Sequence, residues 1–105
     1  MKPIMLKTNL GFDFFDFDEI IMIEAKGHNS FVYAIDREKP VFVRQSLSSI
    51  EKRFCNGILK RCHKSFIINI NYIEELCSKS NRLQMKKKKE AKISSSFKKY
   101  ITSNS

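Results

Sequence analysis

The chain has 105 residues, of which 42% are hydrophobic, which suits one small domain with a modest core and excludes a low-complexity chain. No stretch approaches the roughly 20 apolar residues of a membrane span, and no signal peptide is visible, so we expect a cytoplasmic protein. The net charge of +9 is uneven: residues 1–52 hold 7 Lys/Arg against 8 Asp/Glu, a net −1, and residues 53–105 hold 13 against 3, a net +10. This asymmetry favours a polyanion-facing side, although a solubilising surface explains it equally well.

Short β-like runs make up the first half of the chain. A turn at Asn9-Leu10-Gly11 separates the first two runs, and the polar stretch Lys26-Gly27-His28-Asn29-Ser30 is expected to be a loop. A further turn is expected at Glu38-Lys39-Pro40. We predict strands over residues 3–8, 12–17, 20–25, 31–37 and 41–45.

The period of the hydrophobic pattern then changes. In SLSSIEKRF the apolar residues recur at helical spacing, which predicts a helix over about residues 46–55. Ser48 and Glu51 have the spacing of a capping box, but Ser46 could be the cap instead. Gly57 is a natural stop just past this helix.

The second half returns to short strands. LKRCHKSFIINI (59–70), IEELC (73–77) and RLQMK (82–86) precede the lysine run KKKKE (86–90), where a hairpin turn is expected. This run is either a solvated tip or a source of nonspecific attraction to polyanions. With six to ten short strands and one helix of about two turns, the pattern favours a mainly β domain over an alternating βαβ one.

The three cysteines, Cys55, Cys62 and Cys77, are odd in number and widely spaced, which favours a reducing compartment. They form no C-x₂₋₄-C pair, which disfavours a zinc site. We expect no cofactor. Cys62 lies between Arg61 and His63, so its thiolate could be favoured and oxidisable, but such a cysteine is more often a small buried hydrophobe.

Four segments resemble, in the same order and spacing, the LytTR family of bacterial DNA-binding domains. In the most distinctive one, FCNGILKRCHKSFIININYIEEL, the family's central phrase is matched by Arg61, His63, Ser65, Phe66, Ile67, Ile68, Asn69 and Ile73. The other segments are DFDEIIMIEA, SLSSIEKRF and ISSSFKKYI. The resemblance as a whole covers about residues 4–102, nearly the whole chain.

The resemblance implies a fold and an activity. The fold would be mainly β, an elongated stack of small, mostly antiparallel sheets with one short helix at about 46–55 and a short C-terminal helical turn. The activity would be sequence-specific binding of double-stranded DNA by a transcriptional regulator, with loops in successive major grooves, DNA bending and direct-repeat half-sites. A homodimer and a side-by-side pair on DNA both fit. Many members are output domains of two-component response regulators, but we expect one domain over residues 1–105, with no room for a receiver.

Three polar loops are the candidate DNA contacts, and their residues come partly from the resemblance. In the first loop, Asn29 could bond to adenine and His28 to guanine, although an ordinary turn with Gly27 at positive φ also fits. In the second loop, Lys64 and Ser65 are favoured as DNA contacts, with Arg61 beside them, whereas His63 suits a structural role equally well. The full candidate set is Lys26, His28, Asn29, Ser30, Arg61, His63, Lys64, Ser65, Ser94, Ser95, Ser96, Lys98 and Lys99.

The third loop departs from the family pattern. The family usually carries an Arg just after the first serine, and this chain has Ser95 there. Base readout at this loop is therefore expected to be weaker, altered, or moved to Lys98 or Lys99. The departure leaves a second hypothesis open, a β-domain that binds RNA or a protein partner and has lost base readout. An enzyme is disfavoured, because the chain has no G-x-x-x-x-G-K, G-x-S-x-G or H-E-x-x-H motif.

Overall fold

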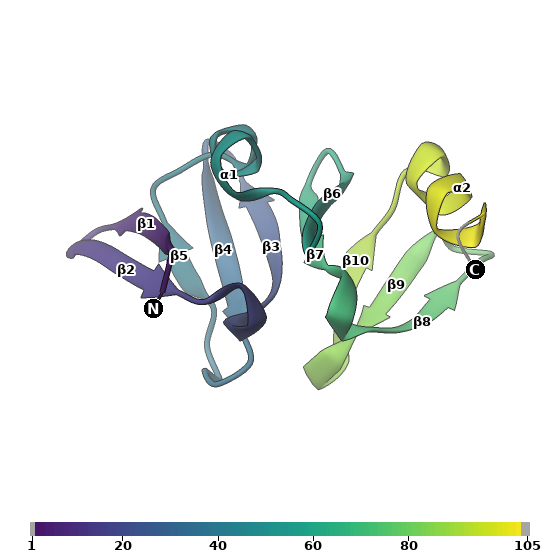
Figure 1. Ribbon diagram of the computed structural model, residues 1–105, viewed down its shortest axis with the longest axis horizontal. Helices are drawn as coiled ribbons and strands as arrows, with labels where there is room; N and C mark the ends of the chain where they lie inside the picture. The colour runs from purple at the N-terminus through teal and green to yellow at the C-terminus, as the bar shows by residue number, and fades with distance from the viewer. Residues whose placement is uncertain (1, 104–105) are drawn as a thin grey trace.

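The structure, a computed structural model, describes residues 2–103 and contains three antiparallel sheets that follow one another along an axis of 40 Å (Figure 1). The other two extents are 24 and 22 Å, so the molecule is elongated. The predicted stack of small antiparallel sheets is confirmed. In the part of the chain described, no helix is long and apolar enough to cross a membrane.

The first sheet is the hairpin of β1 (Ile4–Thr8) and β2 (Gly11–Phe15), as the predicted turn requires. A bidentate ion pair attaches this hairpin to the rest of the molecule. The guanidinium of Arg37 donates to both carboxylate oxygens of Asp13, at 2.7 and 3.1 Å. It also lies 4.9 Å from the ring centroid of Phe15, so one cation contacts two residues on the same face of β2.

The central sheet has the strand order β5-β4-β3-β7-β6 and positions most of the candidate site. Its middle strands are the most apolar, because both of their faces are covered by protein. In β7, all four residues are buried. The strands are β3 (Ile20–Lys26), β4 (Asn29–Ala34), β5 (Val41–Val43), β6 (Leu59–His63) and β7 (Phe66–Asn69).

Helix α1 (Leu47–Phe54) begins where the change in hydrophobic period predicts. Ser46 is the N-cap, since its hydroxyl accepts a hydrogen bond from the Ser49 amide at 3.2 Å. Of the two caps considered, the structure therefore selects Ser46 over Ser48. The helix buries Leu47 and Ile50 against the central sheet.

The third sheet has the order β10-β9-β8 and is followed by the C-terminal helix. That helix, α2, has nine residues, so the C-terminal helical segment is longer than a single turn. The elements are β8 (Ile73–Cys77), β9 (Arg82–Met85), β10 (Lys89–Lys92) and α2 (Ser95–Ser103). Three short 3₁₀ segments complete the described chain, η1 (Phe17–Glu19), η2 (Ile70–Tyr72) and η3 (Lys86–Lys88).

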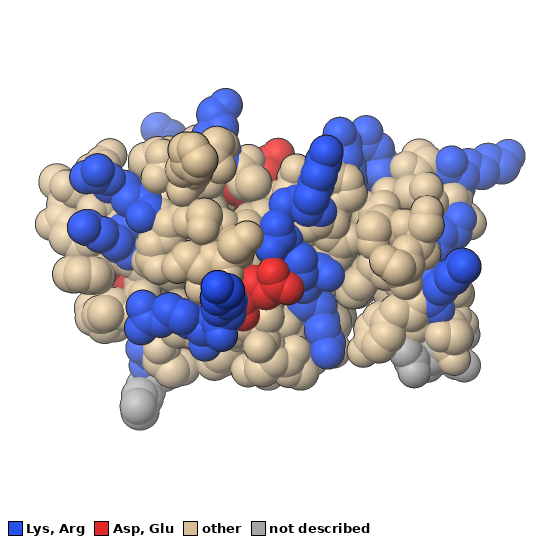
Figure 2. All heavy atoms as spheres, turned by 90° about the horizontal axis from the view of Figure 1, so that it is seen from above, with Lys and Arg blue, Asp and Glu red and all other residues tan. Residues whose placement is uncertain are grey.

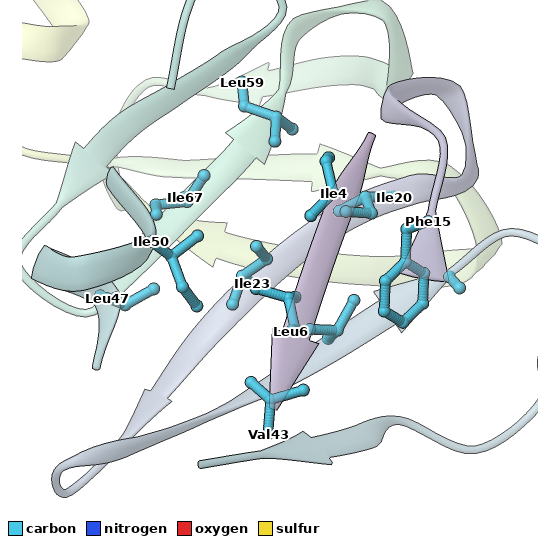
Figure 3. Packing of buried hydrophobic residues seen from close by; sticks show 12 residues of the cluster. Ile4, Leu6, Phe15, Ile20, Ile23, Val43, Leu47, Ile50, Leu59 and Ile67 are labelled. Carbon is cyan, nitrogen blue, oxygen red and sulfur yellow. The ribbon is translucent and has the colours of Figure 1, made fainter. Parts of the chain in front are cut away.

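Two hydrophobic clusters lie on opposite faces of the central sheet. Ile23 and Ile67 face the first cluster, with the β1–β2 hairpin and α1 (Figure 3). Met22 and Ile68 face the second, with the third sheet and α2. Neighbouring residues of a strand point to opposite faces, so β3 and β7 belong to both cores and join the three sheets into one body.

The turn between β9 and β10 has an unusual backbone. Lys87 and Lys88 both have φ of 59°, and the amide of Lys89 donates to the carbonyl of Lys86. Two consecutive positive-φ residues closed by this hydrogen bond match a type I′ turn, which strongly favours Asn-Gly at its two central positions. A non-glycine residue in this region costs on the order of 1 kcal/mol.

Candidate nucleic-acid interface

Two backbone hydrogen bonds bring the three predicted polar loops to one side of the molecule. The amide of Ala25 donates to the carbonyl of Ser65 at 2.9 Å, which joins the first loop to the second. The amide of Ser94 donates to the carbonyl of Cys62 at 2.8 Å, which joins the second to the third. We call the side formed by residues 26–29, 64–65 and 93–96 the turn edge.

The first loop is a tight turn, because β3 extends to Lys26 and β4 already begins at Asn29. Gly27 has a φ of +62°, which lets two residues close the hairpin. Lys26 and His28 are exposed and Asn29 is half-buried, so all three side chains are accessible to a ligand.

Ser30 differs from its neighbours. It is fully buried, and its hydroxyl donates to the carbonyl of Gln45 at 2.8 Å. The reason is strand alternation, since Ser30 is the second residue of β4 and points inward with Val32 and Ala34. Ser30 therefore has no exposed surface for a DNA contact.

Arg61 uses its guanidinium inside the protein. Its Nη1 atom lies 2.7 Å from the Glu51 carboxylate, and its Nε and Nη2 atoms donate to the carbonyls of His63 and Lys64 at 2.9 and 2.6 Å. It thus fixes the β6–β7 turn to α1. The sequence could not show this, because Glu51 is 10 residues away in another element.

His63 supports the same turn. Its Nδ1 atom accepts a hydrogen bond from the Ser65 amide at 3.1 Å. Burial lowers the pKa of His63 below its usual 6.5, and the charges of Lys64, Lys92 and Arg61 lower it further. The ring is therefore neutral at pH 7 and orients the backbone around Lys64, which is exposed at the tip of the turn.

Cys62 lies on the opposite face of β6, where it is buried. Burial raises the pKa of its thiol to about 12. The Sγ atom donates to the carbonyl of Lys92 at 3.4 Å. The thiolate is thus strongly disfavoured at neutral pH, and Cys62 packs as a small hydrophobe in the second cluster.

The serines of the third loop begin helix α2. The Ser94 hydroxyl accepts a hydrogen bond from the Phe97 amide at 3.1 Å and so acts as the N-cap. Ser95 and Ser96 are exposed in the first turn of the helix. Lys98 reaches away from them, because its Nζ donates to the carbonyl of Ser78 at 2.9 Å, whereas Lys99 is exposed.

Two exposed cations near the turn edge were not in the predicted set. Arg44 directly follows β5, and Val43 of that strand pairs with Ser30. Lys92 ends β10, and its charge acts on His63 across the turn edge. Strand alternation could have identified Lys92, because it lies between the buried residues Ala91 and Ile93.

The resulting surface is strongly cationic. Figure 2 shows the molecule from the side that carries α1 and α2 in Figure 1, and groups of Lys and Arg extend over most of its length. Asp and Glu are visible at few places on this face. Such a surface attracts polyanions, and its field is strongest at low ionic strength.

Comparisons with known proteins identify the family and a similar fold. The LytTr DNA-binding domain family matches residues 12–104, a range that includes the whole turn edge. Among solved structures, the chain is similar to the LytTr DNA-binding domain of a methyl-accepting/DNA response regulator from Bacillus cereus. The two are 26% identical with a TM-score of 0.76, and the match covers 98% of this chain and 95% of that chain. No curated protein matches the chain.

Proposed function

Because this chain belongs to the LytTR family of DNA-binding domains, we propose that it is a transcriptional regulator that recognises a specific duplex sequence through the turn edge. The observation that carries the proposal is the pair of backbone bonds, Ala25 to Ser65 and Ser94 to Cys62, that align three polar turns on one cationic side. The similar structure from Bacillus cereus is a domain of a response regulator, which supports a regulatory role.

Base readout is assigned to the first turn. The β3–β4 hairpin is narrow enough for a major groove about 12 Å wide, and it is preorganised by the central sheet. Asn29 would bond to the N6 and N7 atoms of an adenine, and His28 would donate to a guanine acceptor. Lys26 would contact a neighbouring phosphate.

Phosphate contacts are assigned to the cations around the second turn. Lys64 is exposed at the tip of the β6–β7 turn, and Ser65 can add a hydroxyl donor beside it. Arg44 and Lys92 extend this set on either side. If about six phosphates are neutralised in all, the affinity should fall on the order of 10³-fold between 50 and 200 mM salt.

Arg61 and His63 act through the turn and not on the DNA. Their side chains are bonded to the backbone of residues 63–65, so they set the position of Lys64. This arrangement suits binding and not catalysis, because His63 Nδ1 already accepts a hydrogen bond and the Cys62 thiol is buried.

We also propose that the protein binds half-sites arranged as direct repeats and bends the DNA between them. Two copies would occupy adjacent half-sites about one helical turn apart, a spacing of about 34–36 Å. The 40 Å length of the domain is close to this spacing, so neighbouring copies would meet end to end on the duplex. Association into a homodimer without DNA is not required.

The serine at position 95 favours a second candidate. Without an arginine there, the third turn offers only hydroxyl groups and Lys99 to a base. An RNA- or protein-binding module that has lost base readout would show this feature.

Selection from a randomised duplex pool at about 150 mM salt, with excess competitor DNA, tests the proposal. A short motif repeated at roughly 10 base pairs would support a regulator that binds as two copies. If a folded sample enriched no motif, the regulator would be rejected in favour of the second candidate.

A further inference from the structure

The turn between β9 and β10 concentrates positive charge outside the turn edge. Residues 86–89 are four consecutive lysines, and the first three are exposed. Lys89 is half-buried, with its Nζ 5.1 Å from the ring centroid of Tyr33. The nearest acidic residue in the sequence is Glu90, which faces Arg82 at 4.0 Å. The turn therefore presents at least three solvated cations on one short hairpin.

The backbone of this turn would be more stable with other residues. Lys87 and Lys88 occupy the two positive-φ positions of the type I′ turn, where Asn and Gly are the favoured pair. Residues held in such unfavourable conformations cluster at functional sites. Lysines at these two positions add positive charge to the turn and lower the stability of its backbone.

The turn lies on the opposite side of the molecule from the turn edge. Lys92, at one end of β10, accepts a hydrogen bond from the Cys62 thiol next to the second turn. Lys89, at the other end, is about 10 Å away, since each residue of a strand advances about 3.3 Å. In Figure 1 the β9–β10 turn projects downward, whereas α1 and α2 lie at the top. A duplex bound across the turn edge therefore does not reach this turn.

The residue type identifies the class of ligand. Lysine is depleted at protein–protein interfaces, whereas it serves well as a point charge for phosphate groups. The three exposed residues of the turn, Lys86, Lys87 and Lys88, present no apolar side chain that a protein partner would bury. A phosphate backbone is the ligand that such a tip fits best.

We propose that the β9–β10 turn is a second DNA-binding site, which holds the phosphate backbone of another duplex while the turn edge holds the first. This inference rests on the proposed DNA binding at the turn edge. One molecule would then bridge two duplexes, or two segments of one duplex, without any contact between copies of the protein.

The double variant Lys87→Asn/Lys88→Gly tests the site. It removes two charges and supplies the favoured residues of a type I′ turn, so the fold is retained or stabilised. The matched control is Lys39→Gln/Lys79→Gln, which removes two exposed charges elsewhere and gives the same net charge. Thermal unfolding of both variants verifies that they are folded.

The assay immobilises the selected duplex on beads and measures capture of a second, fluorescent duplex of unrelated sequence at about 100 mM salt. We expect wild type and the control to capture it and the double variant to lose capture at least fivefold. All three should bind the immobilised duplex within about twofold of one another. Equal capture by the double variant, or no capture by wild type bound to the first duplex, would overturn the proposal.

Two further arms separate the alternatives. In the first arm, the double variant is mixed with a Lys64→Ala/Lys92→Ala variant, which is impaired only at the turn edge. Capture by the mixture at the wild-type level would mean that copies associate, which would overturn bridging by one molecule.

In the second arm, polyglutamate is added to wild type that is already bound to the first duplex. If this protein bound polyglutamate but did not capture the second duplex, the turn would be assigned to an acidic protein. Failure to bind even the first duplex would instead refute the proposed function.

Discussion

The guanidinium of Arg61 and the carboxylate of Glu51 lie 2.7 Å apart, and the same guanidinium is bonded to the carbonyls of His63 and Lys64. Helix α1 and the β6–β7 turn are therefore coupled through one side chain. Arg61, a candidate DNA contact in the sequence, thus contributes to the shape of the turn.

Replacement of Arg61 tests this role. Arg61→Ala should lower the free energy of unfolding by about 2 kcal/mol, because two carbonyls lose a charged donor. Glu51→Gln is the matched variant, and it should cost less than about 1 kcal/mol, because the Glu51 side chain is 43% exposed. Urea unfolding measures both. If the two variants were equally destabilised, the ion pair and not the carbonyl bonds would fix the turn.

Lys64→Ala should weaken binding to every duplex sequence and reduce the slope of log affinity against log salt by about one. The physical reason is the loss of one phosphate contact without loss of a base contact. Titrations between 50 and 200 mM salt measure the slope, with Lys79→Ala as a control at an exposed lysine in the β8–β9 turn. An unchanged slope would remove Lys64 from the phosphate contacts.

Asn29→Ala should relax the preference at one base position, with a loss of about 1–3 kcal/mol at the preferred base only. Affinities for a set of duplexes that differ at single positions provide the measurement. His28→Ala is the companion variant and should affect a different position. Uniform weakening across all the duplexes would instead make Asn29 a backbone contact.

Arginine at position 95 should add base readout to the third turn. An arginine that bonds to guanine contributes about 1–3 kcal/mol of discrimination, so Ser95→Arg should tighten binding to a subset of sites by roughly tenfold. Ser95→Lys supplies the charge without the bidentate geometry and should tighten binding to all sites by a smaller factor. Equal effects of the two variants on every sequence would argue against a base near this residue.

The stability of the domain should depend on pH through His63. Its pKa is lowered in the folded state, so the unfolded state binds a proton more readily near pH 6.5. The contribution of His63 to the free energy of unfolding is complete above about pH 6.5. It is lost as the pH falls toward the lowered pKa of the folded state. The lowered pKa values of Asp13 and Glu19 act in a lower range, below about 4.5.

Urea unfolding at pH 7.5 and 5.5 measures the pH-dependent contribution of His63 to the free energy of unfolding. His63→Asn keeps an acceptor for the Ser65 amide but has no titrating ring. We expect wild type to lose more stability than this variant between the two pH values. The same loss in both proteins would mean that His63 does not contribute.

Patterns within one element predicted the structure well, and contacts between elements were not visible in the sequence. Hydrophobic spacing indicated α1 and most strands, because an element buried on one face has apolar residues at regular intervals in the sequence. The hydrogen bonds that Arg61 and Lys98 make inside the protein could not be predicted, because nothing local shows that Glu51 and Ser78 accept them. Ser30 is the exception, since the alternation of β4 could have shown that it points inward.

Strands β3 and β7 pack on both of their faces, and this has a consequence for recognition. The turn edge is held by a body whose two cores share those strands, so the turns cannot shift independently to follow a straight duplex. If the turn edge binds a duplex as proposed, any mismatch of shape is absorbed by the DNA. Sites with easily deformed TA or CA/TG steps between the contacted bases should thus be preferred, although the protein touches none of those steps.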